Sequence, residues 1–184
     1  LSTNSQGGGG AVYYLNANTA SSVPSYYDLN LIPNIGTSSF IISTTVSTGT
    51  QSVINLLTED NEPGVNLITY GVWDLNLFGS LSTSSSDVSF YSKIYRYEQS
   101  GTYSLLIKTE DTHITTTSVE QYTTSGLLPI SVTVSNTDRL AVEIFLKNNS
   151  VSDIGVQTII FIVADASGNS SSCITIANVS ETSA

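Results

Sequence analysis

The residues that most often carry acid–base or nucleophilic chemistry are scarce in this chain. Its 184 residues include one histidine, His113, and one cysteine, Cys173. A serine or cysteine nucleophile needs a base beside it, and the sequence contains no G-x-S-x-G elbow that would present such a serine. Cys173 alternates with Thr175 on an expected strand, where an unpaired cysteine usually packs as a small apolar side chain. The sequence therefore predicts a protein that is not an enzyme.

Carboxylates are concentrated in residues 59–62, Glu-Asp-Asn-Glu, directly before Pro63. Oxygen ligands of this kind can hold calcium, although their spacing does not match an EF-hand loop. Glu110-Asp111 allows the same interpretation. A solvated acidic turn is the simpler interpretation in both places. We expect no cofactor, because the glycines at 7–10 also lack the lysine and the following helix of a phosphate-binding loop.

The elements that must position these residues are expected to be strands. Serine and threonine number 31 and 23, and methionine is absent, a composition that favours strands and turns over helices. Trp73, Leu75 and Leu77 alternate with polar residues, which places all three on one buried face of a strand. Similar alternations recur between turn-forming clusters. The pattern predicts an all-β fold, an antiparallel β-sandwich of roughly nine to ten strands.

The strand expected at 88–97 carries large side chains on both faces. One face holds Val88, Phe90 and Ile94, and the other holds three tyrosines, Tyr91, Tyr95 and Tyr97. After a turn at 99–101 the alternation resumes, so residues 88–109 are expected to form a hairpin. The tyrosine row needs a cover, which a loop, the second sheet of the same sandwich or another subunit could provide.

Two later stretches complete the expected sandwich. Alternations at 130–134 and 140–146, separated by a turn at 135–138, predict a second hairpin. The apolar run at 158–163, TIIFIV, predicts a strand that is buried on both faces or lies at an interface. A sandwich has only two inner faces to bury, so this run and the tyrosine row together predict a symmetric oligomer. The candidate contact residues are Tyr91, Tyr95, Tyr97, Ile159 and Phe161.

Charge and low-complexity sequence bound the organisation of the chain. Residues 1–10, LSTNSQGGGG, are expected to form a flexible glycine-rich arm, and residues 11–184 a single β-sandwich domain. Five basic and fifteen acidic residues give a net charge of −10, which repels nucleic-acid phosphates and anionic lipid surfaces. No apolar run approaches the roughly 18 residues of a membrane span. We therefore expect neither nucleic-acid binding nor membrane insertion.

Four motifs occur together in this chain. They are GGGGAVYYLN at 7–16, GVWDLNLFGS at 71–80, IYRYE at 94–98 and TDRLAVEIF at 137–145. In this order they resemble virion structural proteins of tailed phages and of large DNA viruses of algae and protists. The resemblance implies a sandwich of jelly-roll type, similar to the tumour-necrosis-factor and C1q heads, which usually form trimers. It also implies a location in the virion.

The expected function is therefore that of a virion structural protein, either a minor capsid or decoration subunit or a fibre head. It would act as a homo-oligomer, with a trimer as the expected form, and through contacts with other virion proteins. A glycan on the host surface is a further candidate partner. The alternative function is a carbohydrate-binding β-sandwich module, assisted by calcium. Exposed coplanar rings with a cation would favour the sugar-binding module, whereas a large self-association surface would favour the virion protein.

Overall fold

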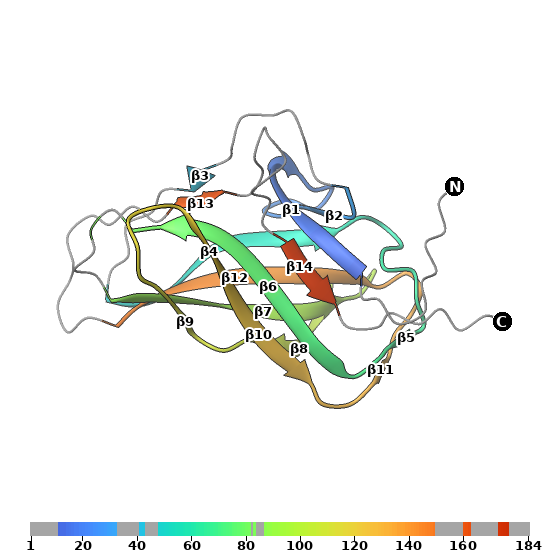
Figure 1. Ribbon diagram of the computed structural model, residues 1–184. Helices are drawn as coiled ribbons and strands as arrows, with labels where there is room; N and C mark the ends of the chain where they lie inside the picture. Colours follow the sequence, from blue (N-terminus) through green and yellow to red (C-terminus); the bar gives the residue numbers. More distant parts are fainter. Residues whose placement is uncertain are drawn as a thin grey trace.

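The computed structural model describes residues 11–32, 41–42, 48–81, 83, 87–149, 160–162 and 173–176. In these residues the chain forms strands and no helix (Figure 1). The strands are β1 (Ala11–Ala20), β2 (Tyr27–Asn30), β3 (Ile41–Ile42), β4 (Gly49–Thr58), β5 (Leu67–Ile68), β6 (Gly71–Ser80), β7 (Val88–Tyr97), β8 (Tyr103–Lys108), β9 (Thr112–Ile114), β10 (Glu120–Leu128), β11 (Val132–Thr133), β12 (Arg139–Asn148), β13 (Ile160–Ile162) and β14 (Cys173–Ile176). A helix that could cross a membrane is accordingly not found in the described part.

Twelve of the strands belong to one sheet. Its order is β3-β13-β6-β14-β1-β2-β4-β12-β7-β8, with β10 paired to β6 and β9 paired to β7. The pairing of β2 with β4 is parallel, and the other pairings in this sheet are antiparallel. Strands β5 and β11 form a separate two-stranded sheet.

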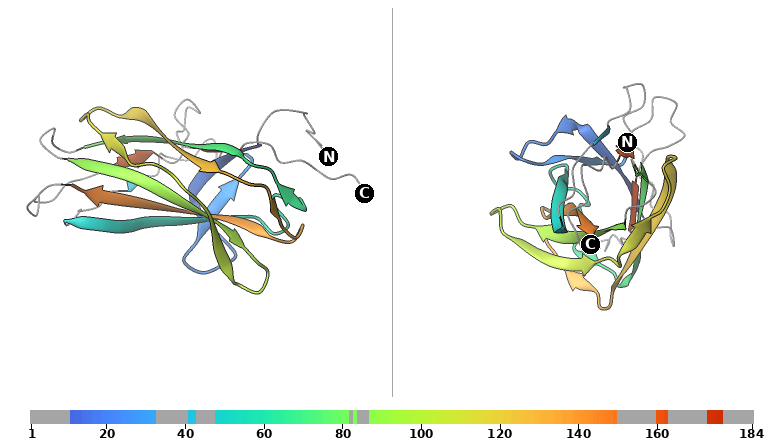
Figure 2. Two further views of the ribbon diagram at one scale, coloured as in Figure 1. Left: turned by 90° about the horizontal axis from the view of Figure 1, so that it is seen from below. Right: turned by 90° about the vertical axis from the view of Figure 1, so that its left-hand side faces the viewer.

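The large sheet curls back on itself (Figure 2). The segment that joins β8 to β9 lies against β10, because the Glu110 amide donates a 2.9 Å hydrogen bond to the Ser125 carbonyl oxygen. The Thr112 hydroxyl donates a second bond, of 3.2 Å, to the Thr123 carbonyl oxygen. Strands far apart in the sheet order therefore face each other across one core. The prediction of an all-β sandwich is confirmed, and its jelly-roll type stays a prediction.

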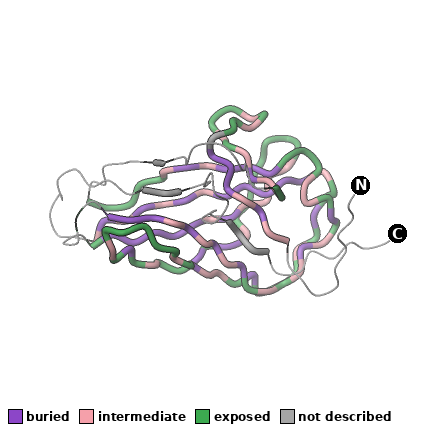
Figure 3. Tube along the Cα trace, turned by 45° about the horizontal axis from the view of Figure 1, so that its top comes forward, coloured by how far each residue is buried: buried purple, intermediate pink, exposed green. Residues whose placement is uncertain are grey.

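Buried residues recur along the strands, and Figure 3 marks them in purple on the chain trace. Trp73, Leu75 and Leu77 are at most 1% exposed, which confirms the predicted inner face of β6. Gly126 of β10 lies opposite Trp73 in register. A Cβ atom at Gly126 would overlap Ile107 Cγ2 and would lie 3.2 Å from the Lys108 carbonyl oxygen. Glycine at this position therefore lets β8 and β10 approach each other where the sheet closes.

The hairpin predicted at 88–109 is confirmed. Strands β7 and β8 pair antiparallel, with Tyr97 opposite Tyr103 and Ile94 opposite Ile107. The connecting turn is closed by a 2.8 Å hydrogen bond from the Glu98 amide to the Thr102 carbonyl oxygen. Gly101 adopts a φ of 87° in this turn, a backbone conformation that favours glycine.

The hairpin predicted at 130–146 is wrong. A turn does form, because the Asp138 amide donates a 2.9 Å hydrogen bond to the Ser135 carbonyl oxygen. The two strands beside it pair with other partners, however. Strand β11 pairs with β5, whereas β12 lies between β4 and β7. The alternation identified which side chains face inward on each strand, but the turn leads the chain from one sheet to the other.

The fourteen observed strands exceed the predicted number because several have only two or three residues, too few to show an alternation. The run 158–163 contains β13, whose Phe161 lies opposite Ile42 and Gly79 in register. The side chain of Phe161 is not among those described, and Ile159 lies outside the described residues, as does the predicted arm 1–10. The assignment of residues 11–184 to a single domain stays a prediction.

Candidate functional site

The tyrosines of β7 lie on the outer face of the sheet formed by β4, β12, β7 and β8. On the inner face of β7, Phe90 and Ile94 are buried. Tyr91, Tyr95 and Tyr97 point the opposite way, as the alternation predicted. We call this outer surface, with Phe145 of β12 and Tyr103 of β8, the tyrosine face.

Each tyrosine of this row packs on another ring of the same chain. Tyr91 stacks on Phe145, with ring centroids 4.9 Å apart and an interplanar angle of 9°. Tyr95 meets Tyr103 edge to face, with a centroid separation of 5.4 Å and an angle of 86°. Tyr97 contacts Tyr26, which precedes β2, at 5.9 Å and 68°. The chain itself therefore supplies part of the cover that the sequence suggested another subunit could provide.

A hollow of about 300 Å³, which we call the tyrosine pocket, opens on this face. Three tyrosines from different segments line it together with a carboxylate and an amide. The lining residues are Ser25, Tyr26, Asn55, Tyr95, Tyr103, Ala141, Val142 and Glu143. The Glu143 carboxylate accepts hydrogen bonds from the Tyr95 hydroxyl at 3.2 Å and from the Ser52 hydroxyl at 2.8 Å.

Two of the phenol groups in the pocket, those of Tyr26 and Tyr95, have raised pKa values. Burial, and then the negative charge of Glu143, raise the pKa of Tyr95 to about 12. The pKa of Tyr26 is also raised, by burial first and then by Tyr97, Tyr103 and Glu143. Burial is the main cause of both shifts, and the Glu143 carboxylate adds to each of them.

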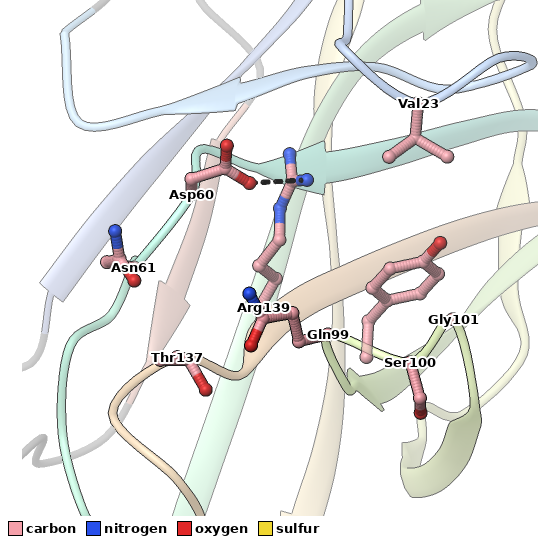
Figure 4. Close-up of a pocket in the computed structure, with 9 residues that line it drawn as sticks. Val23, Asp60, Asn61, Gln99, Ser100, Gly101, Thr137 and Arg139 are labelled. Carbon is pink, nitrogen blue, oxygen red and sulfur yellow. Dashed lines mark ion pairs between the residues drawn. The ribbon is translucent and has the colours of Figure 1, made fainter.

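A second hollow, of about 440 Å³, lies at one end of the strands (Figure 4). Its lining includes Asp60, Thr137 and Arg139. The Arg139 side chain is only 8% exposed, and its Nη1 atom lies 3.0 Å from the Asp60 carboxylate. Arg139 Nε donates a 2.7 Å hydrogen bond to the Thr58 carbonyl oxygen. This arginine therefore fastens the end of β12 to the end of β4.

The neighbouring Asp138 fixes the preceding turn. Its Oδ2 atom accepts hydrogen bonds from the Ser135 amide at 2.7 Å and from Arg96 Nε at 2.6 Å. Asp138 is only 6% exposed, so the carboxylate of this ion pair is shielded from water. The Asp-Arg pair of the sequence thus has a structural role at a strand junction.

The acidic run 59–62 directs its carboxylates to separate partners. Glu59 accepts a 3.0 Å hydrogen bond from the side-chain nitrogen Nδ2 of Asn30, and Asp60 forms an ion pair with Arg139. Glu62 accepts a 3.3 Å bond from the Tyr13 hydroxyl. Burial raises the pKa of Glu62, while the Tyr13 bond lowers it and Glu59 raises it further. Nowhere in the described chain do three or more histidine, cysteine or acidic side chains gather as metal ligands.

His113 lies on β9 and has an acidic partner that the sequence did not reveal. Its Nδ1 atom is 3.0 Å from the Asp87 carboxylate, and both side chains are more than half exposed. The Asn149 side chain also donates to the Asp87 carboxylate, at 3.3 Å. Cys173 lies on β14 opposite Asn76, and its side chain is not among those described.

A patch of exposed apolar side chains lies where β6 begins and β10 ends. Val72 and Leu127 are directly opposite each other in register and are 54% and 60% exposed. Tyr70 and Ile130, just outside the two strands, are 66% and 70% exposed. The Tyr70 amide bonds to the Ser131 hydroxyl at 3.1 Å, which ties the two loops together. We call these four residues the β6–β10 patch.

The sequence identified the three tyrosines of β7 but not the pocket beside them. Tyr26 lies in a loop, and Tyr103 and Glu143 lie on neighbouring strands. One feature of the sequence could have located Glu143. In β12, Ala141, Glu143 and Phe145 alternate with apolar residues that face the core, so Glu143 must face outward. Nothing in the sequence indicated that the Tyr26 loop would reach the same place.

No protein-family model and no curated protein sequence matches this chain. Among solved structures, a CocE/NonD family hydrolase from Staphylococcus aureus has a TM-score of 0.61 at 12% identity, over 94% of this chain and 37% of the hydrolase. An α-amino acid ester hydrolase has a TM-score of 0.58 at 12% identity, over 91% of this chain and 36% of its own. The infectious bursal disease virus Gx strain structure matches at 0.41 and 14% identity, over 86% and 36% of the two chains.

The chain thus spans little more than a third of the length of the hydrolases that it resembles. At this identity the likeness shows a shared fold. The prediction of a protein that is not an enzyme is contradicted by these matches, because solved structures that match the chain with TM-scores of 0.61 and 0.58 are those of hydrolases. The sequence argument weighed only catalytic motifs within these 184 residues, whereas the fold itself also occurs in hydrolase chains. What the comparisons establish is an all-β fold that also occurs as part of hydrolase chains.

Proposed function

We propose that this chain is a structural β-sandwich that acts through protein–protein assembly, as the sequence resemblance to virion structural proteins suggests. The observation that carries the proposal is the β6–β10 patch, whose four large apolar side chains are 54% to 70% exposed. Apolar groups gathered in this way on a folded surface commonly mark a binding site for protein. The partner that we propose is a second copy of the chain.

The outer face of β6 and β10 makes the patch distinct from its surroundings. Farther along the two strands, outward-facing polar side chains form hydrogen bonds from one strand to the other. The Ser125 hydroxyl donates to the Asp74 carboxylate, and the Thr123 hydroxyl donates to the Asn76 side-chain oxygen. Only the end at Val72 and Leu127 presents an apolar pair. In a symmetric contact this end would meet the same end of another copy, so that no aspartate need be buried.

The tyrosine face is a weaker candidate for that contact than the sequence suggested. Tyr91 is only 8% exposed, and its ring is occupied by Phe145. The sugar-binding alternative also loses support. A sugar-binding surface needs exposed coplanar rings. On this face the rings of Tyr95 and Tyr103 lie at 86° to each other, and the rings of Tyr26 and Tyr97 lie at 68°.

Leu127→Glu is expected to abolish self-association, because it places a charge in the middle of the patch. Light scattering on the purified chain at high micromolar concentration should show an oligomer, with a trimer as the form that the resemblance implies, and a monomer for Leu127→Glu. Leu105→Glu is the matched control, since Leu105 is 53% exposed on β8 and lies outside the patch. A monomeric unmodified chain, or disruption by Leu105→Glu alone, would contradict the proposal.

The likeness to hydrolases favours a second function. In this proposal the chain is the β-sandwich part of a longer hydrolase, and the β6–β10 patch contacts the rest of that protein. The support is the agreement over 94% of this chain with 37% of a hydrolase chain.

The two functions differ in where the protein is found and what accompanies it. An antibody raised against the described domain would isolate the natural protein, whose mass and ester-hydrolysing activity can then be measured. The assembly function expects the protein in purified virus particles. The hydrolase function expects a chain well above 19.5 kDa with ester turnover that His113→Ala leaves unchanged, because His113 has only an exposed carboxylate as its partner. Loss of turnover in folded His113→Ala would instead place catalysis at His113 and Asp87.

A further inference from the structure

The tyrosine pocket combines three aromatic rings with one negative charge. Tyr95 and Tyr103 stand at 86° to each other, so they form a corner rather than a flat wall. Tyr26 enters from the loop before β2 and lines the same hollow. A volume of about 300 Å³ admits a small alkylated group but not a folded segment.

The charge in the pocket has no cationic partner. Glu143 accepts its two hydrogen bonds from hydroxyl groups, and no ion pair of Glu143 occurs within the described residues. Lys93 is directly opposite Glu143 in register. Its ammonium nitrogen nevertheless lies over the Phe145 ring, 5.1 Å from the centroid. None of the residues that line the pocket is basic.

The same face already holds two ammonium groups on aromatic rings. Besides Lys93 over Phe145, the Lys108 nitrogen lies 4.8 Å from the centroid of Tyr91. Such contacts are attractive because the negative face of an aromatic ring meets a cation. The tyrosine pocket has more rings than either of these places, and it adds a carboxylate. It lacks only the cation.

From this arrangement we propose that the tyrosine pocket binds an alkylammonium group. The rings would surround the alkyl part of the group, while the Glu143 carboxylate would balance its charge. The Glu143 carboxylate contributes, after burial, to the raised pKa values of Tyr26 and Tyr95, which agrees with a negative charge in the pocket. The net charge of −10 further favours the approach of a cation. This site lies apart from the β6–β10 patch and does not depend on the assembly function.

Two sources could supply the alkylammonium group, a small quaternary ammonium compound or the lysine side chain of a protein. Choline serves as the probe for a quaternary ammonium compound, and Nα-acetyl-lysine methylamide, whose ε-ammonium group is free, serves as the probe for a lysine side chain. Each is titrated into the protein, and binding is followed by the amide chemical shifts. We expect saturable binding of at least one probe, with the largest shifts at Tyr26, Tyr95 and Glu143. Tighter binding of choline would identify a quaternary ammonium ligand, and tighter binding of the lysine derivative would identify a protein ligand. The neutral isostere 3,3-dimethylbutanol should bind at least about tenfold more weakly than choline, because it lacks the charge.

Three variants test the assignment of the site. Glu143→Gln and Tyr103→Leu should each weaken binding about tenfold, the first by removing the charge and the second by removing a ring that is 61% exposed. Tyr14→Leu, on β1, is the matched control and should bind as the unmodified chain does. The proposal fails if neither probe saturates, if the neutral isostere binds as tightly as choline, or if Glu143→Gln and Tyr103→Leu both retain full affinity.

Discussion

Replacing Trp73 with alanine will lower the free energy of unfolding by about 3 to 5 kcal/mol. The indole is fully buried on the inner face of β6, which β10 and β14 flank. Alanine removes most of its apolar contacts and leaves a cavity that the surrounding strands cannot fill without losing their register. Urea denaturation followed by far-ultraviolet circular dichroism will measure the loss.

Two further variants separate the causes of this effect. Trp73 Nε1 has no hydrogen-bond partner in the described structure. Trp73→Phe should therefore cost less than half as much as Trp73→Ala, since it keeps a ring and removes no hydrogen bond. The control Val119→Ala, at a residue that is 43% exposed just before β10 and outside the β6–β10 patch, should change stability by less than about 0.5 kcal/mol. A loss below about 1 kcal/mol for Trp73→Ala would contradict the packing described for β6.

Replacing Asp138 with alanine will lower the free energy of unfolding by about 2 kcal/mol. The substitution leaves Arg96 without its 2.6 Å partner and leaves the Ser135 amide without its acceptor. Asp138 itself is only 6% exposed, so its two bonds are partly shielded from water. The Arg96 side chain is 26% exposed and keeps a second partner in Glu98 at 3.4 Å, which limits the loss. Urea denaturation at neutral pH is again the measurement.

The chain offers a matched ion pair for comparison. Asp111 pairs with Lys147 at 3.0 Å, but these side chains are 37% and 42% exposed. Asp111→Ala should cost less than about 1 kcal/mol, since water screens the pair and replaces its hydrogen bond. Equal losses for Asp138→Ala and Asp111→Ala would show that burial does not strengthen the Asp138 contact.

Periodicity in the sequence predicted which side chains face the core. It placed Trp73 correctly, and it placed Phe90 and Tyr91 on opposite faces of β7, because a strand alternates its side chains whatever its partner is. It also predicted the β7–β8 hairpin, whose turn is only a few residues long. Local sequence is sufficient where local geometry decides the pairing.

Periodicity did not predict pairings that depend on the whole fold. Residues 130–134 alternate as regularly as the strands of a hairpin do. Strand β11 nevertheless pairs with β5, which is far away in the sequence, and not with β12. The tyrosine pocket has the same origin, because Tyr26 reaches Tyr95 only after β2 has paired with β4. Likewise, the partner of His113 is Asp87, which lies in the loop before β7. Such neighbours result from the curl of the sheet, which no short segment encodes.

Strand β14 determines when this fold can be completed. It lies between β1 and β6 and pairs with both, so that Ala11 is opposite Ile176 and Leu75 is opposite Ile174. During synthesis β1 and β6 leave the ribosome long before β14. Until then the edges that they will offer to β14 remain unpaired, and unpaired strand edges can bind other chains. Closing so long a loop is also slow. The newly made protein therefore passes through an open form in which misassembly competes with the final pairing.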